Sequence, residues 1–121
     1  MNFSPEDRTA PAGDHRADGP VTLMNGFAVA ADRDDVFHAA WYETSRYFVQ
    51  RPGFISLRLH RALSPQAPHR WVNVAVWQSE EDFRAAHTTE EFRRLVSQEK
   101  WQEFPSSPNL FEVDTAEGPT N

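Results

Sequence analysis

The sequence predicts one α+β domain in which four strands and two helical segments follow the order strand, helix, strand, strand, helix, strand. A chain of 121 residues is long enough for a single core but not for two domains. Its 39% hydrophobic and 12% aromatic residues are enough to fill that core. After residue 20, apolar residues recur alternately at strand spacing and at helical spacing. Residues 1–20 are polar and turn-rich, and we expect them to form a disordered arm.

The first strand and the first helix follow this arm. Residues 21–30, VTLMNGFAVA, are apolar enough for a strand that is buried on both faces. Asp32 is a suitable N-cap, and apolar residues at helical spacing predict a helix over residues 33–50. The helix ends at Arg51-Pro52-Gly53, because proline disfavours helical geometry in the residue before it and glycine permits a turn.

The two central strands form a predicted hairpin. Residues 54–63 alternate between apolar and polar side chains, which is typical of a half-buried strand. The prolines in residues 64–69 indicate a turn, and residues 70–78 are rich in β-branched and aromatic side chains. One face of the first of these strands is expected to carry Ile55, Leu57 and Leu59, and the other face Ser56, Arg58 and His60.

The last third of the chain predicts two short helices and a strand. Capping-box spacing at Ser79 and at Thr88 predicts helices over residues 80–87 and 89–101. The prolines in residues 105–108 end this segment. A fourth strand is expected over residues 109–114, and residues 115–121 are expected to be a flexible tail.

The order βαββαβ is typical of a ferredoxin-like fold with a four-stranded antiparallel sheet. Right-handed crossovers place both helical segments on one face of such a sheet. The other face is apolar in this sequence, and a second copy of the chain would bury it. We therefore expect residues 21–114 to form a domain that pairs into a homodimer, a dimeric α/β barrel.

Charge and composition exclude several classes of function. The net charge of −6 is the wrong sign for binding nucleic acid or an anionic membrane. No apolar run is long enough to cross a membrane. The absence of cysteine removes disulfides, thiolate metal sites and a cysteine nucleophile, and it favours the cytoplasm. No motif for nicotinamide, flavin or ATP binding occurs.

Two strands carry an amide in the middle of an apolar face. Asn25 is in register with apolar residues of the first strand, and Asn73 shares a face with Trp77. A buried amide without partners costs about 1–3 kcal/mol. The amides therefore either bond to the backbone or serve as neutral donors to an oxygen anion on a substrate. Likewise Trp77 is either a core residue or an aromatic wall with an N–H donor.

Aromatic and basic residues extend this candidate site. A slot between sheet and helices that accepts a polycyclic aromatic molecule would be lined from the helices, with Trp41, Phe48 and Phe83 as candidates. Among the histidines no pair has metal-ligand spacing, and we expect no metal. His60 and His87 are candidate acid–base groups, and Arg58 is a candidate partner for an enolate; ordinary surface roles are the alternative for all three.

Three segments resemble one known family. The stretches VTLMNGFAVA, RPGFISLRLHRAL and RWVNVAVWQSEEDFRAAHTTEEFRRL resemble the antibiotic biosynthesis monooxygenase family over residues 21–114. The most specific parts are the P-G-F turn and the N-x-x-x-W-x-S-x-x-x-F run. The resemblance implies a ferredoxin-like dimer that binds a small aromatic molecule.

Within this family, the small anthrone oxygenases of aromatic polyketide pathways imply a mechanism. Their strand amides and indole fall on Asn25, Asn73 and Trp77. Deprotonation of the substrate gives a carbanion that passes an electron to O₂, so the resemblance implies no cofactor. Some members carry a tyrosine at the position of Phe83, which leaves His87, His60 or Arg58 as the acid or base.

Two alternatives stay open. The haem-degrading members of the family depend on a tryptophan and a histidine that fall near Ala86 and Val96, so both are absent here, although His87 is adjacent to the first position. The fold also suits a protein that binds or cyclises a polyketide intermediate without oxidising it.

Overall fold

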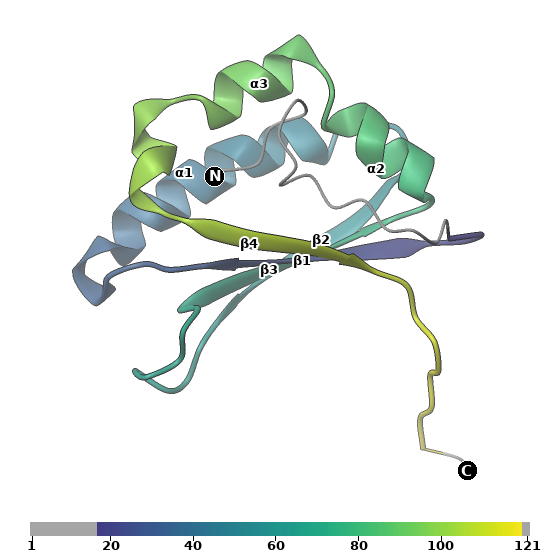
Figure 1. The fold of residues 1–121 in the computed structure, drawn as a ribbon, viewed down its shortest axis with the longest axis horizontal. Helices are drawn as coiled ribbons and strands as arrows, with labels where there is room; N and C mark the ends of the chain where they lie inside the picture. Colours follow the sequence, from purple (N-terminus) through teal and green to yellow (C-terminus); the bar gives the residue numbers. More distant parts are fainter. Residues whose placement is uncertain (1–16, 120–121) are drawn as a thin grey trace.

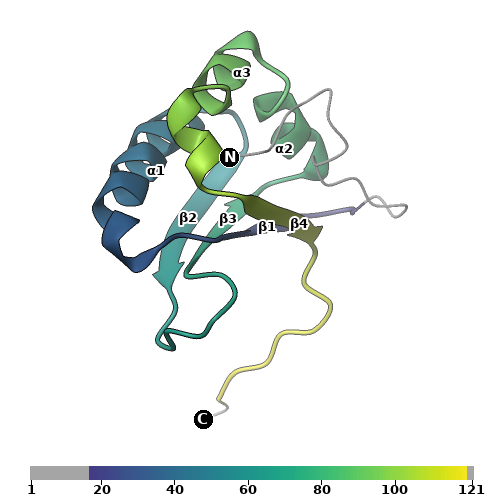
Figure 2. The ribbon, with the colours of Figure 1, turned by 60° about the vertical axis from the view of Figure 1, so that its left-hand side comes forward.

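The computed structural model describes residues 17–119, which form one sheet covered by helices. Most of the predicted arm, residues 1–16, lies outside the described residues. The strands have the order β2-β3-β1-β4, and every neighbouring pair is antiparallel. Figures 1 and 2 show all the helices on one face of this sheet, while the chain after β4 leaves toward the other face. The predicted ferredoxin-like α+β fold is confirmed.

The elements follow the predicted order. The strands are β1 (Val21–Phe27), β2 (Phe54–Arg61), β3 (Trp71–Trp77) and β4 (Ser106–Phe111). The helices are η1 (Ala31–Arg33), α1 (Asp34–Phe48), α2 (Glu80–Ala86), α3 (Glu90–Val96) and η2 (Glu99–Glu103). In the described part of the chain, no helix is both long and apolar enough to cross a membrane.

The C-terminal elements differ from the expectation in two places. β4 starts at Ser106, three residues before the predicted strand at 109, and includes Pro108. A proline is tolerated there because β4 is an edge strand and pairs only with β1. The predicted helix over residues 89–101 ends at Val96, and a separate 3₁₀ turn, η2, follows it.

A β-bulge changes the expected faces of β2. The register with β3 shifts between Phe54 and Ser56, so Phe54 pairs with Trp77 on the helix-covered face. Ile55 is left as the extra residue and is 48% exposed, which corrects its predicted place beside Leu57 and Leu59. The bulge thus brings an aromatic ring, rather than Ile55, under the helices.

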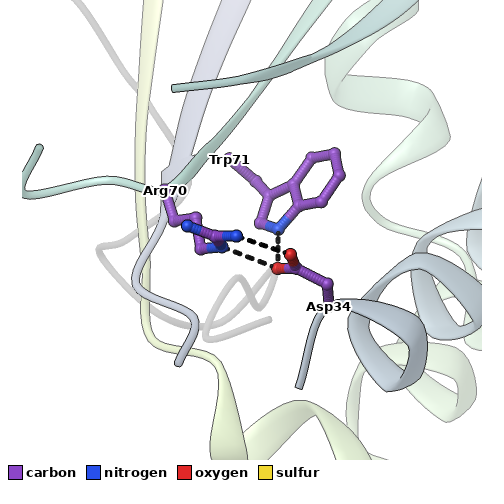
Figure 3. Close-up of polar contacts among 3 residues, drawn as sticks. All are labelled: Asp34, Arg70 and Trp71. Atoms are coloured by element: carbon purple, nitrogen blue, oxygen red, sulfur yellow. Dashed lines mark hydrogen bonds and ion pairs between the residues drawn. The ribbon is translucent and has the colours of Figure 1, made fainter. Parts of the chain in front are cut away.

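A half-buried ion pair fixes the start of α1 to β3. One carboxylate oxygen of Asp34 accepts hydrogen bonds from Arg70 Nε and from Trp71 Nε1, each at 2.8 Å, and the other accepts from an Arg70 terminal nitrogen at 2.7 Å (Figure 3). Hydrogen bonds from Arg70 are the main reason why the pKa of Asp34 is lowered to about 2. Three charge-assisted or polar bonds on one carboxylate hold the helix in a defined position over the sheet.

The turn before β2 depends on Gly53. Its φ is +82°, a conformation that side chains with a Cβ rarely adopt. A Cβ there would also clash with the carboxylate of Asp82 at the start of α2. The carbonyl of Gly53 accepts a hydrogen bond from Gln78 N at 2.8 Å, which joins the turn to the end of β3.

We predict that Gly53→Ala destabilises the fold. The left-handed conformation alone costs about 1–2 kcal/mol for a residue with a Cβ, and the clash adds to it. Urea unfolding measures the difference. Gly118→Ala is the matched control, because nothing lies within 4 Å of a Cβ at that glycine. Equal stabilities of the two variants would contradict this account of the turn.

Candidate functional site

Asn25 and Asn73 lie directly opposite each other on the helix-covered face of β1 and β3. On one side of this pair, Leu23 and Ala75 belong to a core cluster under α2 and α3. On the other side, Phe27 and Trp71 belong to a second core cluster built around Phe37 and Trp101. The two amides therefore form a polar layer between two apolar halves of the core.

A small cavity opens at this layer. It measures about 30 Å³ and lies between the sheet and the helices. That is room for about one water molecule, far less than the slot for a polycyclic molecule that we expected. The polar lining comes from Asn25, Asn73, Trp77 and His87, and the apolar lining from Leu23, Phe48, Phe54, Leu57 and Ala75.

The Asn73 side chain is oriented by Trp41. The indole Nε1 of Trp41, on α1, donates a hydrogen bond to Asn73 Oδ1 at 3.3 Å. Because the oxygen of this amide is engaged, Nδ2 is the group that Asn73 offers to another partner. Trp41, a candidate for the aromatic lining, does not line the cavity. It contacts the Asn73 amide instead.

Two other polar atoms of the lining have no partner among residues 17–119. Asn25 Oδ1 and Trp77 Nε1 are both buried and make no hydrogen bond with the described residues. Each of these two residues is only 1% exposed. Buried polar atoms are nearly always paired, so one acceptor and one donor beside the same cavity call for a ligand or water.

His87, at the C-terminal end of α2, is a neutral base beside the cavity. Its Nδ1 lies 2.6 Å from the carbonyl oxygen of Phe83, which can only accept, so the ring proton is on Nδ1 and the lone pair is on Nε2. The ring is 3% exposed and packs against Phe83, with ring centroids 4.1 Å apart. Burial lowers the pKa of His87 to about 4.

The remaining predicted site residues have different places. Phe48 lines the cavity, and Phe83 lies behind the His87 ring instead of on the cavity surface. The structure corrects the expected placement of Arg58 and His60. They pair with Val74 and Val72, whose side chains point away from Asn73, so both are exposed on the face without helices.

Sequence reasoning missed the place of Phe54 and the hydrogen bonds of Tyr47, which it counted only among the aromatic residues of the covering helices. Phe54 lines the cavity and packs edge-on against Trp77, because the bulge at Ile55 turns it inward. Tyr47 supports the segment that carries His87: its hydroxyl donates to Ala86 O at 2.5 Å and bonds with Thr89 Oγ1 at 2.6 Å. The bulge has no sequence signal, whereas an inward tyrosine on the apolar stripe of α1 is a recognisable sign.

Comparison with known proteins gives structural neighbours but no curated relative. No curated protein matches the chain significantly. A proposed monooxygenase from Shewanella loihica is 31% identical, with a TM-score of 0.69 over 83% of this chain and 100% of that chain. SnoaB, a cofactor-independent oxygenase from Streptomyces nogalater, is 25% identical, with a TM-score of 0.68 over 81% of this chain and 96% of that chain.

A haem-degrading protein from Mycobacterium tuberculosis shares the fold. It is 22% identical, with a TM-score of 0.61 over 82% of this chain and 99% of that chain. The family model for antibiotic biosynthesis monooxygenases matches residues 20–98, which include every residue that lines the cavity. The chain therefore belongs to the antibiotic biosynthesis monooxygenase family.

Proposed function

We propose that this protein is a cofactor-independent monooxygenase that oxidises an aromatic polyketide-like anthrone or phenol with O₂ in secondary metabolism. The observation that carries the proposal is the cavity at which Asn25, Asn73, Trp77 and His87 meet. The similarity to the cofactor-independent oxygenase SnoaB supports the same reaction class. The cytoplasm, suggested by composition, is the proposed location.

The Asn73 amide and the Trp77 indole would stabilise negative charge on the substrate oxygen. Asn73 Nδ2 and Trp77 Nε1 are neutral donors at a buried cavity. Fixed neutral donors favour an enolate more strongly in a dry site than in water, because no solvent has to reorganise. Trp41 keeps the Asn73 amide in the orientation that this role needs.

Oxidation then proceeds without an added reductant. Loss of a C–H proton from an anthrone gives an enolate, which transfers one electron to O₂. Recombination of the radical with superoxide forms a C–O bond, and protonation gives a hydroperoxide. Loss of water leaves a new carbonyl, so that one anthrone and one O₂ give one quinone and one H₂O.

His87 is the proposed proton acceptor. With Nδ1 bonded to the Phe83 carbonyl, Nε2 holds the lone pair that would accept the proton. A pKa of about 4 makes the ring a weak base in the ligand-free protein. An enolate in the cavity would raise that pKa, because opposite charges stabilise each other strongly at low dielectric.

Substrate entry requires the apolar wall to move. A bound aromatic ligand needs several hundred Å³, far more than the 30 Å³ of the cavity. Among the lining residues, Phe48, Phe54 and Leu57 are only half-buried. We propose that these side chains swing aside when the substrate enters.

The residues present do not fit haem. His87 is the one histidine at the cavity within residues 17–119, and its ring is enclosed by Phe48, Phe83 and Phe92. A porphyrin iron at this ring would have to displace not only the half-buried Phe48 but also Phe83 and Phe92, which are fully buried in the core. The haem-degrading neighbour at 22% identity supports the fold and not this chemistry.

We also propose that the protein is a homodimer that pairs through the sheet face without helices. Val72, Val74 and Val76 of β3 lie on that face, in register with β1 residues that include Met24, which is 43% exposed. Phe111 of β4 is in register with Thr22 there and is 47% exposed. Exposed apolar side chains that gather on one face of a sheet are typical of an interface.

Oxygen uptake is the first test of the proposed function. We expect metal-stripped protein to consume O₂ and form a quinone from 1,8-dihydroxyanthrone, after subtraction of autoxidation. Asn73→Ala should lower the turnover rate roughly 100-fold or more, because it removes a donor to the enolate. Trp77→Phe should also lower turnover, since the phenyl ring lacks the indole N–H.

Gln102→Ala is the control for this experiment, because Gln102 is exposed on η2, outside both the cavity lining and the bare face of the sheet, and turnover should not change. Ligand affinity is measured in parallel by calorimetry. If the wild-type protein consumes no O₂ and the substitutions change only the affinity for the ligand, the protein binds or cyclises its ligand and does not oxidise it.

Light scattering tests the proposed dimer. The wild-type mass at micromolar concentration should correspond to two chains. Val74→Glu should give one chain, because it places a charge at the centre of the apolar face. Val36→Glu replaces a valine on α1 that is 37% exposed and should leave the dimer intact. A wild-type mass of one chain would refute the proposal.

Stability should fall as the pH is lowered from about 7.5 to 5, because of His87. Its folded pKa of about 4 is below the ordinary value of 6.5, so between these values the unfolded chain binds more protons. The loss should be on the order of 2 kcal/mol at pH 5. His87→Asn should remove this pH dependence, whereas His38→Asn, which replaces an exposed histidine, should keep it. Urea unfolding at the two pH values measures the difference, and identical losses in wild type and His87→Asn would contradict it.

A further inference from the structure

The lining of the cavity has a defined hydrogen-bonding polarity. Asn73 offers Nδ2, because Trp41 engages its Oδ1 at 3.3 Å. Trp77 Nε1 is a donor only. Asn25 Oδ1 is an acceptor that receives no hydrogen bond from any residue between 17 and 119. Two donors and one buried acceptor therefore surround the space that a ligand would occupy.

We propose that Asn25 determines specificity, because its Oδ1 accepts a hydrogen bond from a free hydroxyl of the aromatic ligand. The site then selects a phenol or an enol over the corresponding ether. This inference rests on the proposed function for the position of the site, but it does not require turnover.

The register of the strands explains why one hydroxyl suits both amides. Asn25 and Asn73 are directly opposite on neighbouring antiparallel strands, where Cβ atoms are about 5 Å apart. A hydroxyl oxygen between the two amides can donate to Asn25 Oδ1 and accept from Asn73 Nδ2. An ether oxygen can accept from Asn73, but it leaves Asn25 Oδ1 unpaired.

Burial makes this difference large. The Asn25 residue is 1% exposed, so bulk water does not reach its oxygen once a ligand fills the cavity. A site with a buried polar group strongly rejects an analogue that cannot pair with that group. Preference for the hydroxyl should therefore depend on Asn25 and be independent of hydrophobic contact, which the two ligands share.

Calorimetric titration with 2-naphthol and 2-methoxynaphthalene tests the proposal. The wild-type protein should bind 2-naphthol at least tenfold more tightly than the ether. In Asn25→Leu, which has a similar volume and no acceptor, the two affinities should agree within about twofold. Asn73→Leu is the matched control: it should weaken both ligands and keep the preference, because Asn25 still accepts.

Three results would overturn the proposal: equal wild-type affinities, a preference that persists in Asn25→Leu, or no binding of either compound. Equal affinities would mean that Asn25 Oδ1 serves only a buried water. Thermal melting checks that Asn25→Leu is folded, and Asn25→Val is the second variant if it is not. If the protein takes up no oxygen but prefers the hydroxyl, the proposed oxygenase function is wrong and this inference holds. If it takes up oxygen but binds both compounds equally, the oxygenase function holds and this inference is wrong.

Discussion

The register between β1 and β3 determines where the two amides and the Trp77 indole of the cavity lie. Asn25 faces Asn73, with Leu23 opposite Ala75 on one side and Phe27 opposite Trp71 on the other. Because side chains alternate along a strand, a slip of β3 by one residue against β1 would move Asn73 to the bare face and turn Val72 and Val74 toward the helices, while Asn25 stayed in place. The hydrogen bonds between β1 and β3 thus determine both the apolar packing and the position of the amide layer.

An amide layer inside a core is unfavourable unless its atoms are paired. Trp41 satisfies Asn73 Oδ1, and the position of Trp41 depends on how α1 crosses the sheet. Asp34 fixes the start of that helix by bonds to Arg70 and Trp71. Asn25 Oδ1 has no such partner within the described residues. The two amides are therefore unequal: one is held by the protein, and the other is available to a ligand.

The sequence predicts most of the fold and the polar centre of the site, because both depend on local patterns. The alternation that places Asn25, Asn73 and Trp77 on one face is a property of single strands, and the structure preserves it. Long-range pairing decides the rest. Pro108 is compatible with β4 only because that strand is at the edge, and Phe54 lines the cavity only because of the bulge at Ile55. Which face of β2 meets the helices also depends on pairing, which is why Arg58 and His60 fall outside the cavity.

In the proposed mechanism, the small cavity links substrate entry to proton transfer. Aromatic rings around His87 bury it, and this burial lowers its pKa to about 4, so the ring stays neutral in the free protein. A substrate that displaces Phe48 and Phe54 would bring its own hydroxyl or carbonyl to the amides and would keep water out. Only the enolate then supplies a charge that can stabilise a protonated His87. In this arrangement the base gains its proton affinity from the ionised substrate, so the enclosed ring would be protonated in the complex and remain neutral in the free protein.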